Sequence, residues 1–236
     1  MDGLFSVIGV QFGVILLAGI VHASLQCELG ALLLLYHASL GKHIKRKTKY
    51  LVSNYILGSA LLICLFVSTF VFLIATFTKS SLSINSLAVL VVALIMLALV
   101  IWFFYYKNNR STQLWLPLSF SRYINKRAKL TESNVEAFSL GMLTAFAEMP
   151  FSIVLMLVAG NSVVLLPFEL QFVSVIGYTF IAVLPLFILR FFIRRGSTVV
   201  DVQKWRMKNK NFLKVLSGTL FLTLAIFIIG FKILGA

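Results

Sequence analysis

The sequence predicts an all-α integral membrane protein, in which six transmembrane helices form two inverted three-helix repeats with broken first helices. The 236 residues are 60% hydrophobic and only 12% charged, a composition typical of membrane proteins. Long apolar runs recur six times, and positively charged residues lie between the runs or at their ends. The first and fourth runs both contain polar residues near their centres. Paired interruptions of this kind indicate the binding site of a transporter.

The six apolar runs cover about residues 4–40, 51–77, 83–106, 137–159, 168–193 and 212–234. The first is unusually long, because the 38 residues from Leu4 to Gly41 include no Lys, Arg or Pro, whereas a helix crosses a bilayer core with about 20 residues. We expect this run to be interrupted at His22–Gly30. We expect the fourth run to break at Pro150 and the fifth to bend at Pro185, because proline removes an amide donor and clashes with the preceding turn.

The positive charges predict the orientation of the chain. Nineteen of the 21 Lys and Arg residues lie in three regions, between the first and second, the third and fourth, and the fifth and sixth runs or at the adjoining ends of these runs, so six spans would place all of them on one side. By the positive-inside rule this side is cytoplasmic and both termini lie outside. We expect the plasma (inner) membrane of a prokaryote. Topology and contact with anionic lipid explain the net charge of +14 better than a nucleic-acid partner, which we do not expect.

The chain divides into a first three-helix repeat, residues 1–107, a basic cytoplasmic connecting loop, 108–134, and a second repeat, 135–236. The two repeats align without gaps around the interruptions, with Gly19 opposite Gly141 and Gln26 opposite Glu148. An odd number of spans in each half gives the halves opposite orientations, so the two breaks should meet near the midplane. Within the loop, Trp115–Phe120 could lie along the membrane surface.

Two carboxylates accompany the predicted breaks, Glu28 at the first and Glu148 at the second. Ionisable side chains inside a membrane are costly and usually functional. Because burial disfavours the charged form of a carboxyl group, either residue could take up and release a proton during a transport cycle. The alternative is a protonated, hydrogen-bonded residue with a structural role.

A soft metal ion offers a second interpretation of the same position. His22, Cys27, Glu148 and Met149 would supply imidazole, thiolate, carboxylate and thioether ligands. No metal-binding spacing accompanies them, and Met149 fits core packing equally well. The sequence therefore establishes no cofactor, and a soft transition metal ion is one candidate substrate. Gly30, Pro150 and Pro185 are candidate hinges, although a glycine inside a membrane helix more often permits close packing.

Several segments resemble the membrane domain of the CcdA/DsbD thiol-disulfide electron carriers, within the LysE-type exporter superfamily. Gly19 followed by Gln26-Cys27, and Gly141 to Pro150, resemble the two glycine-containing broken helices of that family. Tyr178–Phe187 and Leu213–Leu220 are similar to its fifth and last helices. The resemblance implies a site at the two breaks, and Tyr178 completes the predicted binding set: Gln26, Cys27, Glu28, Glu148, Met149 and Tyr178.

The chemistry of that family requires one cysteine on each broken helix. Cys27 occupies the first position, but Met149 occupies the second, and a thioether cannot exchange with a disulfide. The resemblance therefore carries over the fold and the location of the site, without the electron transfer.

The leading functional hypothesis is a secondary transporter for a small solute or metal ion, coupled to protons or ions and not an enzyme, with alternating access around the midplane site. The runner-up is a thiol-redox protein that uses Cys27 with a thioredoxin-like partner. A third hypothesis is a non-transporting membrane scaffold or assembly factor. A homodimer is compatible with so small a transporter, although no sequence feature requires one.

Overall fold

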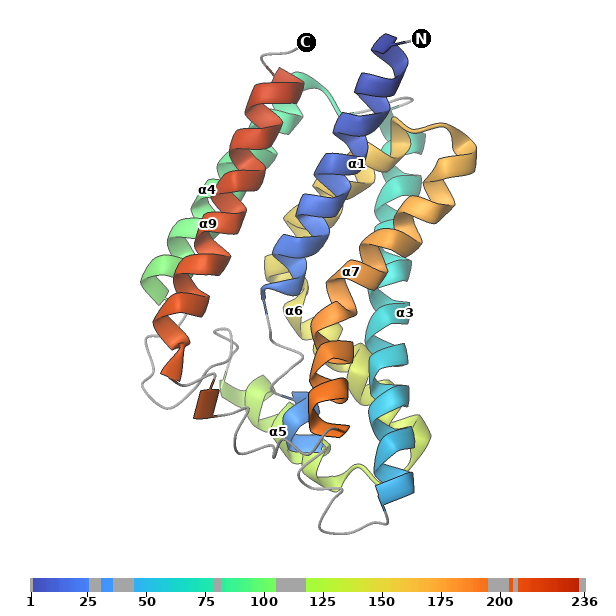
Figure 1. Ribbon diagram of the computed structural model, residues 1–236, viewed down its shortest axis with the longest axis vertical. Coiled ribbons are helices and arrows are strands. Elements are labelled where there is room, and N and C mark those ends of the chain that lie inside the picture. The colour runs from blue at the N-terminus through green and yellow to red at the C-terminus, as the bar shows by residue number, and fades with distance from the viewer. Residues whose placement is uncertain are drawn as a thin grey trace.

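The computed structural model describes residues 2–25, 31–35, 45–78, 82–104, 118–194, 204–205 and 208–233. They form an elongated bundle of helices (Figure 1), and no strand occurs among them. The elements are α1 (Asp2–Ala23), α3 (Lys45–Thr78), α4 (Ile84–Phe104), α5 (Leu118–Leu130), α6 (Asn134–Val164), α7 (Phe168–Arg194), α9 (Lys210–Ile228) and the π-helical turn η1 (Ile229–Ile233). The predicted all-helical fold is therefore confirmed.

Five of the helices, α3, α4, α6, α7 and α9, are long and apolar enough to cross a membrane. They present large apolar side chains outward, among them Phe72, Phe103 and Phe172, as helices in contact with lipid do. The apolar part of α1, Val7–Ala23, is shorter. The structure thus supports a lipid bilayer environment with five membrane-length helices, one fewer than the six predicted spans.

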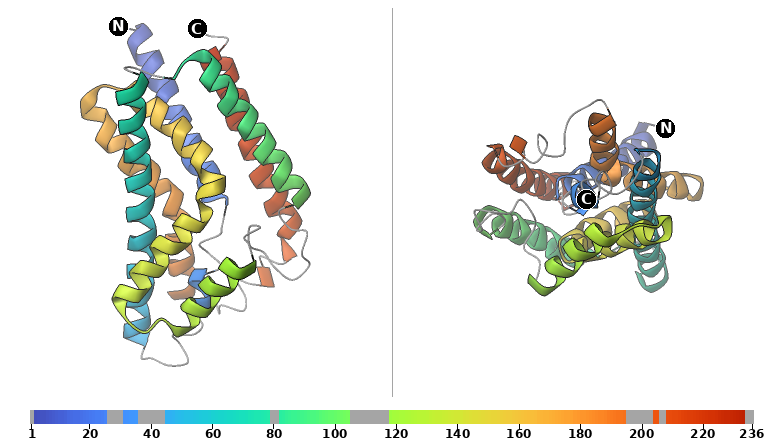
Figure 2. Two further views of the ribbon diagram at one scale, coloured as in Figure 1. Left: turned by 180° about the vertical axis from the view of Figure 1, so that it is seen from behind. Right: turned by 90° about the horizontal axis from the view of Figure 1, so that it is seen from below.

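The bundle has a main group of four helices and a pair packed beside it. Helices α1, α3, α6 and α7 form the main group, and α4 pairs with α9 along one flank (Figures 1 and 2). Helix α1 contacts α6, α7 and α9, so its buried face lies at the centre of the hydrophobic core.

Most basic residues of the described helices lie at one end of the bundle, whereas Lys232 belongs to η1 at the other. The start of α3, the end of α7, the start of α9 and all of α5 lie at this end, whereas α1 begins and η1 ends at the other (Figure 1). The basic side chains carried there include Lys47, Lys49, Arg122, Lys126, Arg127, Lys129, Arg190 and Lys214. These described residues therefore lie at the same end of the bundle, and the side of the membrane that this end faces stays a prediction.

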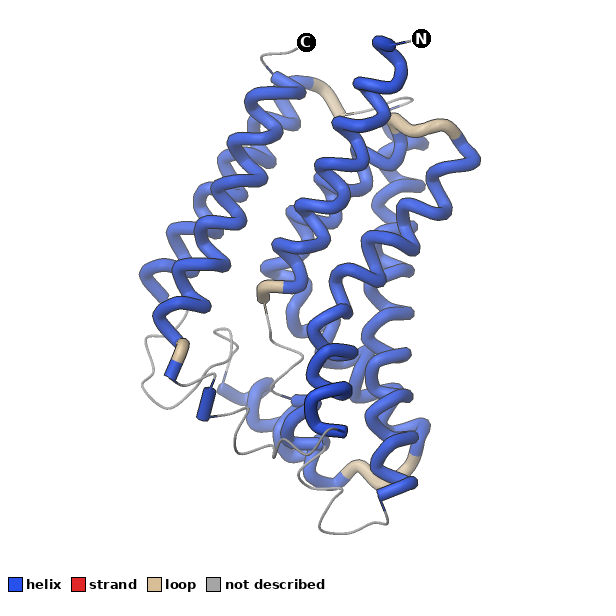
Figure 3. Tube along the Cα trace, viewed as in Figure 1, coloured by secondary structure: helices blue, strands red, loops and turns tan. Residues whose placement is uncertain are grey.

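Helix α1 ends at Ala23, inside the interruption predicted from the sequence. The short loop that follows lies well within the length of the bundle, away from both of its ends (Figure 3). The backbone amide of Leu25 donates to the carbonyl of His22, 3.0 Å away, a tight turn in place of the regular helical pattern. Residues 26–30 lie outside the described part of the chain.

The predicted break at Pro150 is wrong. Helix α6 runs without interruption from Asn134 to Val164, with Pro150 inside it, and changes direction along its course (Figure 2). A proline removes only one amide donor, and a helix packed on its neighbours can absorb this loss as a bend. Helix α7 likewise continues through Pro185 and curves (Figure 1).

Helices α3 and α6 cross with their backbones in contact. A Cβ atom on Gly58 would meet the backbone carbonyl of Phe138, and one on Gly141 would meet the backbone carbonyl of Tyr55. Two glycines facing each other therefore allow an approach that larger residues would prevent. The hydroxyl of Ser59 adds a hydrogen bond to the carbonyl of Gly141, at 3.1 Å.

A capping box fixes the start of α6. The hydroxyl of Ser133 accepts a hydrogen bond from the amide of Glu136 at 3.2 Å, and the carboxylate of Glu136 accepts one from the amide of Ser133 at 3.3 Å.

We expect Ser133→Ala to destabilise the protein by about 1 kcal/mol, because an amide of the first turn of α6 loses its hydrogen-bond partner. Thermal unfolding in detergent measures the effect. Ser68→Ala, at an exposed position within α3, is the control and should match wild type; an equal loss in both variants would contradict the role of the cap.

Candidate functional site

The last turn of α1 carries a buried histidine that is bonded to a buried tyrosine of α7. The Nδ1 atom of His22 and the hydroxyl of Tyr178 are 2.9 Å apart, and their ring centroids are 5.8 Å apart. The side chains are only 3% and 0% exposed. Because the bond joins residues 156 positions apart in the chain, it fixes the end of α1 against the middle of α7.

Glu148 on α6 brings a carboxyl group to the same place. It is 3% exposed and interacts electrostatically with Tyr178. Three ionisable side chains from α1, α6 and α7 therefore lie in one buried region inside the bundle. Two of them, Glu148 and Tyr178, belong to the predicted binding set, and His22 to the predicted metal set.

The neighbouring backbone is also held by polar contacts. The hydroxyl of Ser217, on α9, donates to the carbonyl of Ser24 at 3.1 Å, just after α1 ends. The hydroxyl of Ser152 donates to the carbonyl of Glu148 at 3.3 Å, one turn later on α6. Both serines are buried. Since the first contact satisfies a carbonyl group released by the end of α1, it stabilises an interruption that would otherwise be expensive in a membrane.

The remaining predicted site residues divide into two groups. Gln26, Cys27, Glu28 and Gly30 lie outside the described residues, so their roles stay predictions. Met149 is half-buried, Pro150 is exposed and Pro185 is half-buried. Among the described residues, no group of three His, Cys, Asp or Glu side chains is placed to hold a metal ion.

A second buried tyrosine makes a closely related contact, which the sequence alone did not predict. The hydroxyl of Tyr55, on α3, lies 2.7 Å from the hydroxyl of Thr144, on α6, and both side chains are buried. Thr144 follows His22 by 122 positions, the offset that aligns Gly19 with Gly141, and Tyr178 follows Tyr55 by 123. This spacing was the only sequence signal that could have identified the pair.

A further polar contact lies toward the opposite end of the bundle, within η1. The ammonium group of Lys232 donates to the hydroxyl of Ser162, on α6, at 2.8 Å. The side-chain oxygen of Asn161, the residue before Ser162, accepts a hydrogen bond from the amide of Leu82 at 2.7 Å. These contacts connect the ends of α9 and α6 to the start of α4.

Comparisons of the chain with protein-family models, with curated proteins and with solved structures gave no significant match.

Proposed function

We propose that the protein is a secondary transporter whose site is the cluster of His22, Glu148 and Tyr178. The observation that carries the proposal is the buried bond between His22 and Tyr178 beside the Glu148 carboxyl group. Ionisable groups are expensive inside a membrane, and those that persist there usually serve transport or proton transfer. Their location, where one helix ends inside the bundle, is the place at which transporters with interrupted helices bind substrates and coupling ions.

Contacts between the helices support an inverted repeat. Let α1, α3 and α4 correspond to α6, α7 and α9. Exchanging the two halves then converts the α1–α7 contact into the α6–α3 contact, and the α1–α9 contact into the α6–α4 contact. All four of these pairs pack together. The self-corresponding pairs α1–α6, α3–α7 and α4–α9 also pack together, as an axis relating the halves requires.

Side-chain contacts repeat in the same manner. A Cβ atom on Gly19 of α1 would approach Tyr178 and Ile181 of α7, and one on Gly141 of α6 would approach Tyr55 and Ser59 of α3. Each glycine thus packs against the buried tyrosine of the corresponding helix. In one half that tyrosine bonds His22, and in the other it bonds Thr144. The two halves therefore share their architecture but differ in ionisable chemistry, which concentrates the proposed proton binding on the His22 side.

Alternating access would come from motion around this cluster. Helix α1 ends beside it, and α6 contains Pro150 two residues after Glu148. A helix that lacks one backbone hydrogen bond bends at lower cost than a regular one. Protonation of His22 and Glu148 would alter their attraction across the junction of α1, α6 and α7, and so couple a proton gradient to the movement. The basic end of the bundle faces the cytoplasm in this proposal.

Reconstitution of the purified protein tests this function. Liposomes that enclose a pH-sensitive dye and carry an imposed pH gradient would be exposed in turn to Mn²⁺, Zn²⁺, Cu⁺ and a set of amino acids. We expect at least one of these probes to accelerate decay of the gradient relative to protein-free liposomes. If folded, reconstituted protein gives no probe-dependent proton movement with any of them, a scaffold or assembly role is favoured over transport.

A further inference from the structure

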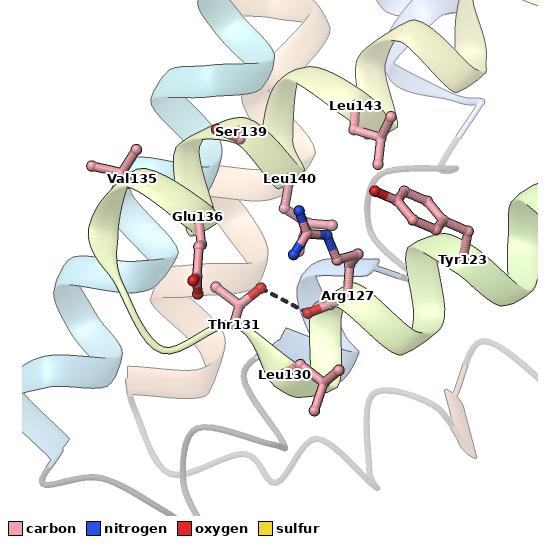
Figure 4. A pocket seen from close by; sticks show the side chains of 9 residues that line it. All are labelled: Tyr123, Arg127, Leu130, Thr131, Val135, Glu136, Ser139, Leu140 and Leu143. Carbon is pink, nitrogen blue, oxygen red and sulfur yellow. Dashed lines mark hydrogen bonds between the residues drawn. The ribbon is translucent and has the colours of Figure 1, made fainter.

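A cavity lies between α5 and the first turns of α6 (Figure 4), and neither His22 nor Tyr178 lines it. Its volume is about 270 Å³. The residues around it combine one guanidinium group, one carboxyl group and one phenol with several aliphatic side chains. They are Tyr123, Arg127, Leu130, Thr131, Val135, Glu136, Ser139, Leu140 and Leu143.

The orientation of α5 places this cavity at the expected level of lipid head groups. Viewed from below, α5 extends across the ends of the long helices and does not run parallel to them (Figure 2). It buries Ile124 and Ala128 against the bundle and exposes Lys126 and Lys129. An amphipathic helix with basic residues on its polar face is typical of one that lies in the membrane interface.

The polar part of the cavity centres on Arg127. Its guanidinium carbon lies 5.9 Å from the centre of the Tyr123 ring, a contact that holds the side chain toward the cavity. Glu136 attracts Arg127 electrostatically, but its carboxylate already accepts hydrogen bonds from the amides of Glu132 and Ser133, at 2.9 and 3.3 Å. The donors of the guanidinium group therefore remain the main means by which the cavity can bind an anion.

The apolar part of the cavity leads toward the lipid-facing surface. Leu140 is buried, Leu143 is half-buried, and Leu130 and Val135 are more than half exposed. A soluble anion would gain nothing from this aliphatic wall, whereas the glycerol and upper acyl chain of a phospholipid would bury apolar surface against it. The volume also suits a head group better than a folded segment of another protein.

We propose that this cavity binds the head group of an anionic phospholipid, with the phosphate at Arg127 and the upper acyl chain along Leu140 and Leu143. A bidentate contact between guanidinium and phosphate fits the geometry of arginine. The neighbouring Lys126 and Lys129 add to the positive potential that selects anionic over zwitterionic lipid. The bound lipid would hold α5 against the start of α6.

Native mass spectrometry of the whole protein, titrated with phosphatidylglycerol or phosphatidylcholine, tests the proposal. We expect one phosphatidylglycerol to bind selectively and Arg127→Gln to weaken it about fivefold. Arg122→Gln removes the same charge from an exposed position on the same helix, outside the residues that line the cavity, and should leave selective binding unchanged. Arg127→Lys, which keeps the charge without the bidentate fork, should retain part of the affinity.

Two results would overturn the proposal. Equal weakening in Arg122→Gln and Arg127→Gln would mean that diffuse charge, not this cavity, attracts the lipid. Displacement of the lipid by inorganic phosphate at millimolar concentration would identify a site for the free anion. Circular dichroism of each variant excludes loss of folding as the cause, and Arg127→Lys remains informative if Arg127→Gln does not fold.

Discussion

Replacing Gly58 and Gly141 together by alanine is expected to prevent the protein from folding into its helical bundle. At this crossing each new methyl group would overlap a backbone carbonyl of the opposing helix, that of Phe138 or of Tyr55. A backbone cannot rotate away as a long side chain can, so α3 and α6 must separate. Overpacking of a well-packed core usually costs about 1–3 kcal/mol. We expect at least the upper end of that range here, a large part of the stability of a typical domain.

The measurement is size-exclusion chromatography followed by thermal unfolding in detergent. The single variants should unfold at lower temperature than wild type, and the double variant should elute as aggregate. Gly177→Ala is the matched control, because a Cβ atom at this position of α7 would meet no atom within 4 Å. It should be neutral or slightly stabilising, since alanine favours a helix more than glycine does. Wild-type stability of Gly58→Ala would mean that α3 and α6 lie farther apart than in this structure.

This crossing also illustrates what the sequence can and cannot predict. Apolar length alone located all five membrane-length helices, because a continuous apolar run of about 20 residues satisfies its backbone inside a bilayer by forming a helix. The same reasoning gave their ends less accurately. Helix α3 begins at Lys45, six residues before the predicted run, because lysines favour a helix as long as their charges reach water. Glycine at positions 58 and 141 indicated close packing, but not which helices would pack.

The candidate site was predicted only in part, for related reasons. Placing a carboxyl group inside a membrane costs free energy, so an acidic residue within an apolar run indicates a functional site. Glu148 was predicted on this ground. Tyr55 and Thr144 carry no such cost, because their hydroxyl groups are uncharged, and that of Thr144 also donates to the carbonyl of Leu140 in its own helix. Pro150 was assigned too strong an effect, since tertiary packing retains a continuous helix around a single missing hydrogen bond. These features depend on which helix faces pack against each other, and a single sequence does not specify this packing.

Glu148→Gln is expected to reduce proton-coupled flux to the level of protein-free liposomes. Glutamine has nearly the same shape and can still form hydrogen bonds, but it cannot take up or release a proton. If the carboxyl group at the junction of α1, α6 and α7 carries the coupling proton, the driving force is lost while the fold is retained. The dye-loaded liposomes described above give the measurement, using whichever probe moves protons with the wild-type protein. The double variant Glu28→Gln/Glu148→Gln extends the test to the other predicted carboxylate.

The two buried tyrosines provide a matched pair that separates function from structure. Tyr178→Phe and Tyr55→Phe each remove one hydroxyl from a side chain that is 0% exposed, and each ends a bond between two helices. Both should therefore lower stability by about 1 kcal/mol. Only Tyr178→Phe removes the hydrogen-bond partner of His22, so only this variant should also slow proton-coupled flux, by about five- to tenfold. Equal flux in the two variants would show that the cluster around Tyr178 is a structural contact like its counterpart, and would remove the chemical basis for assigning transport to it.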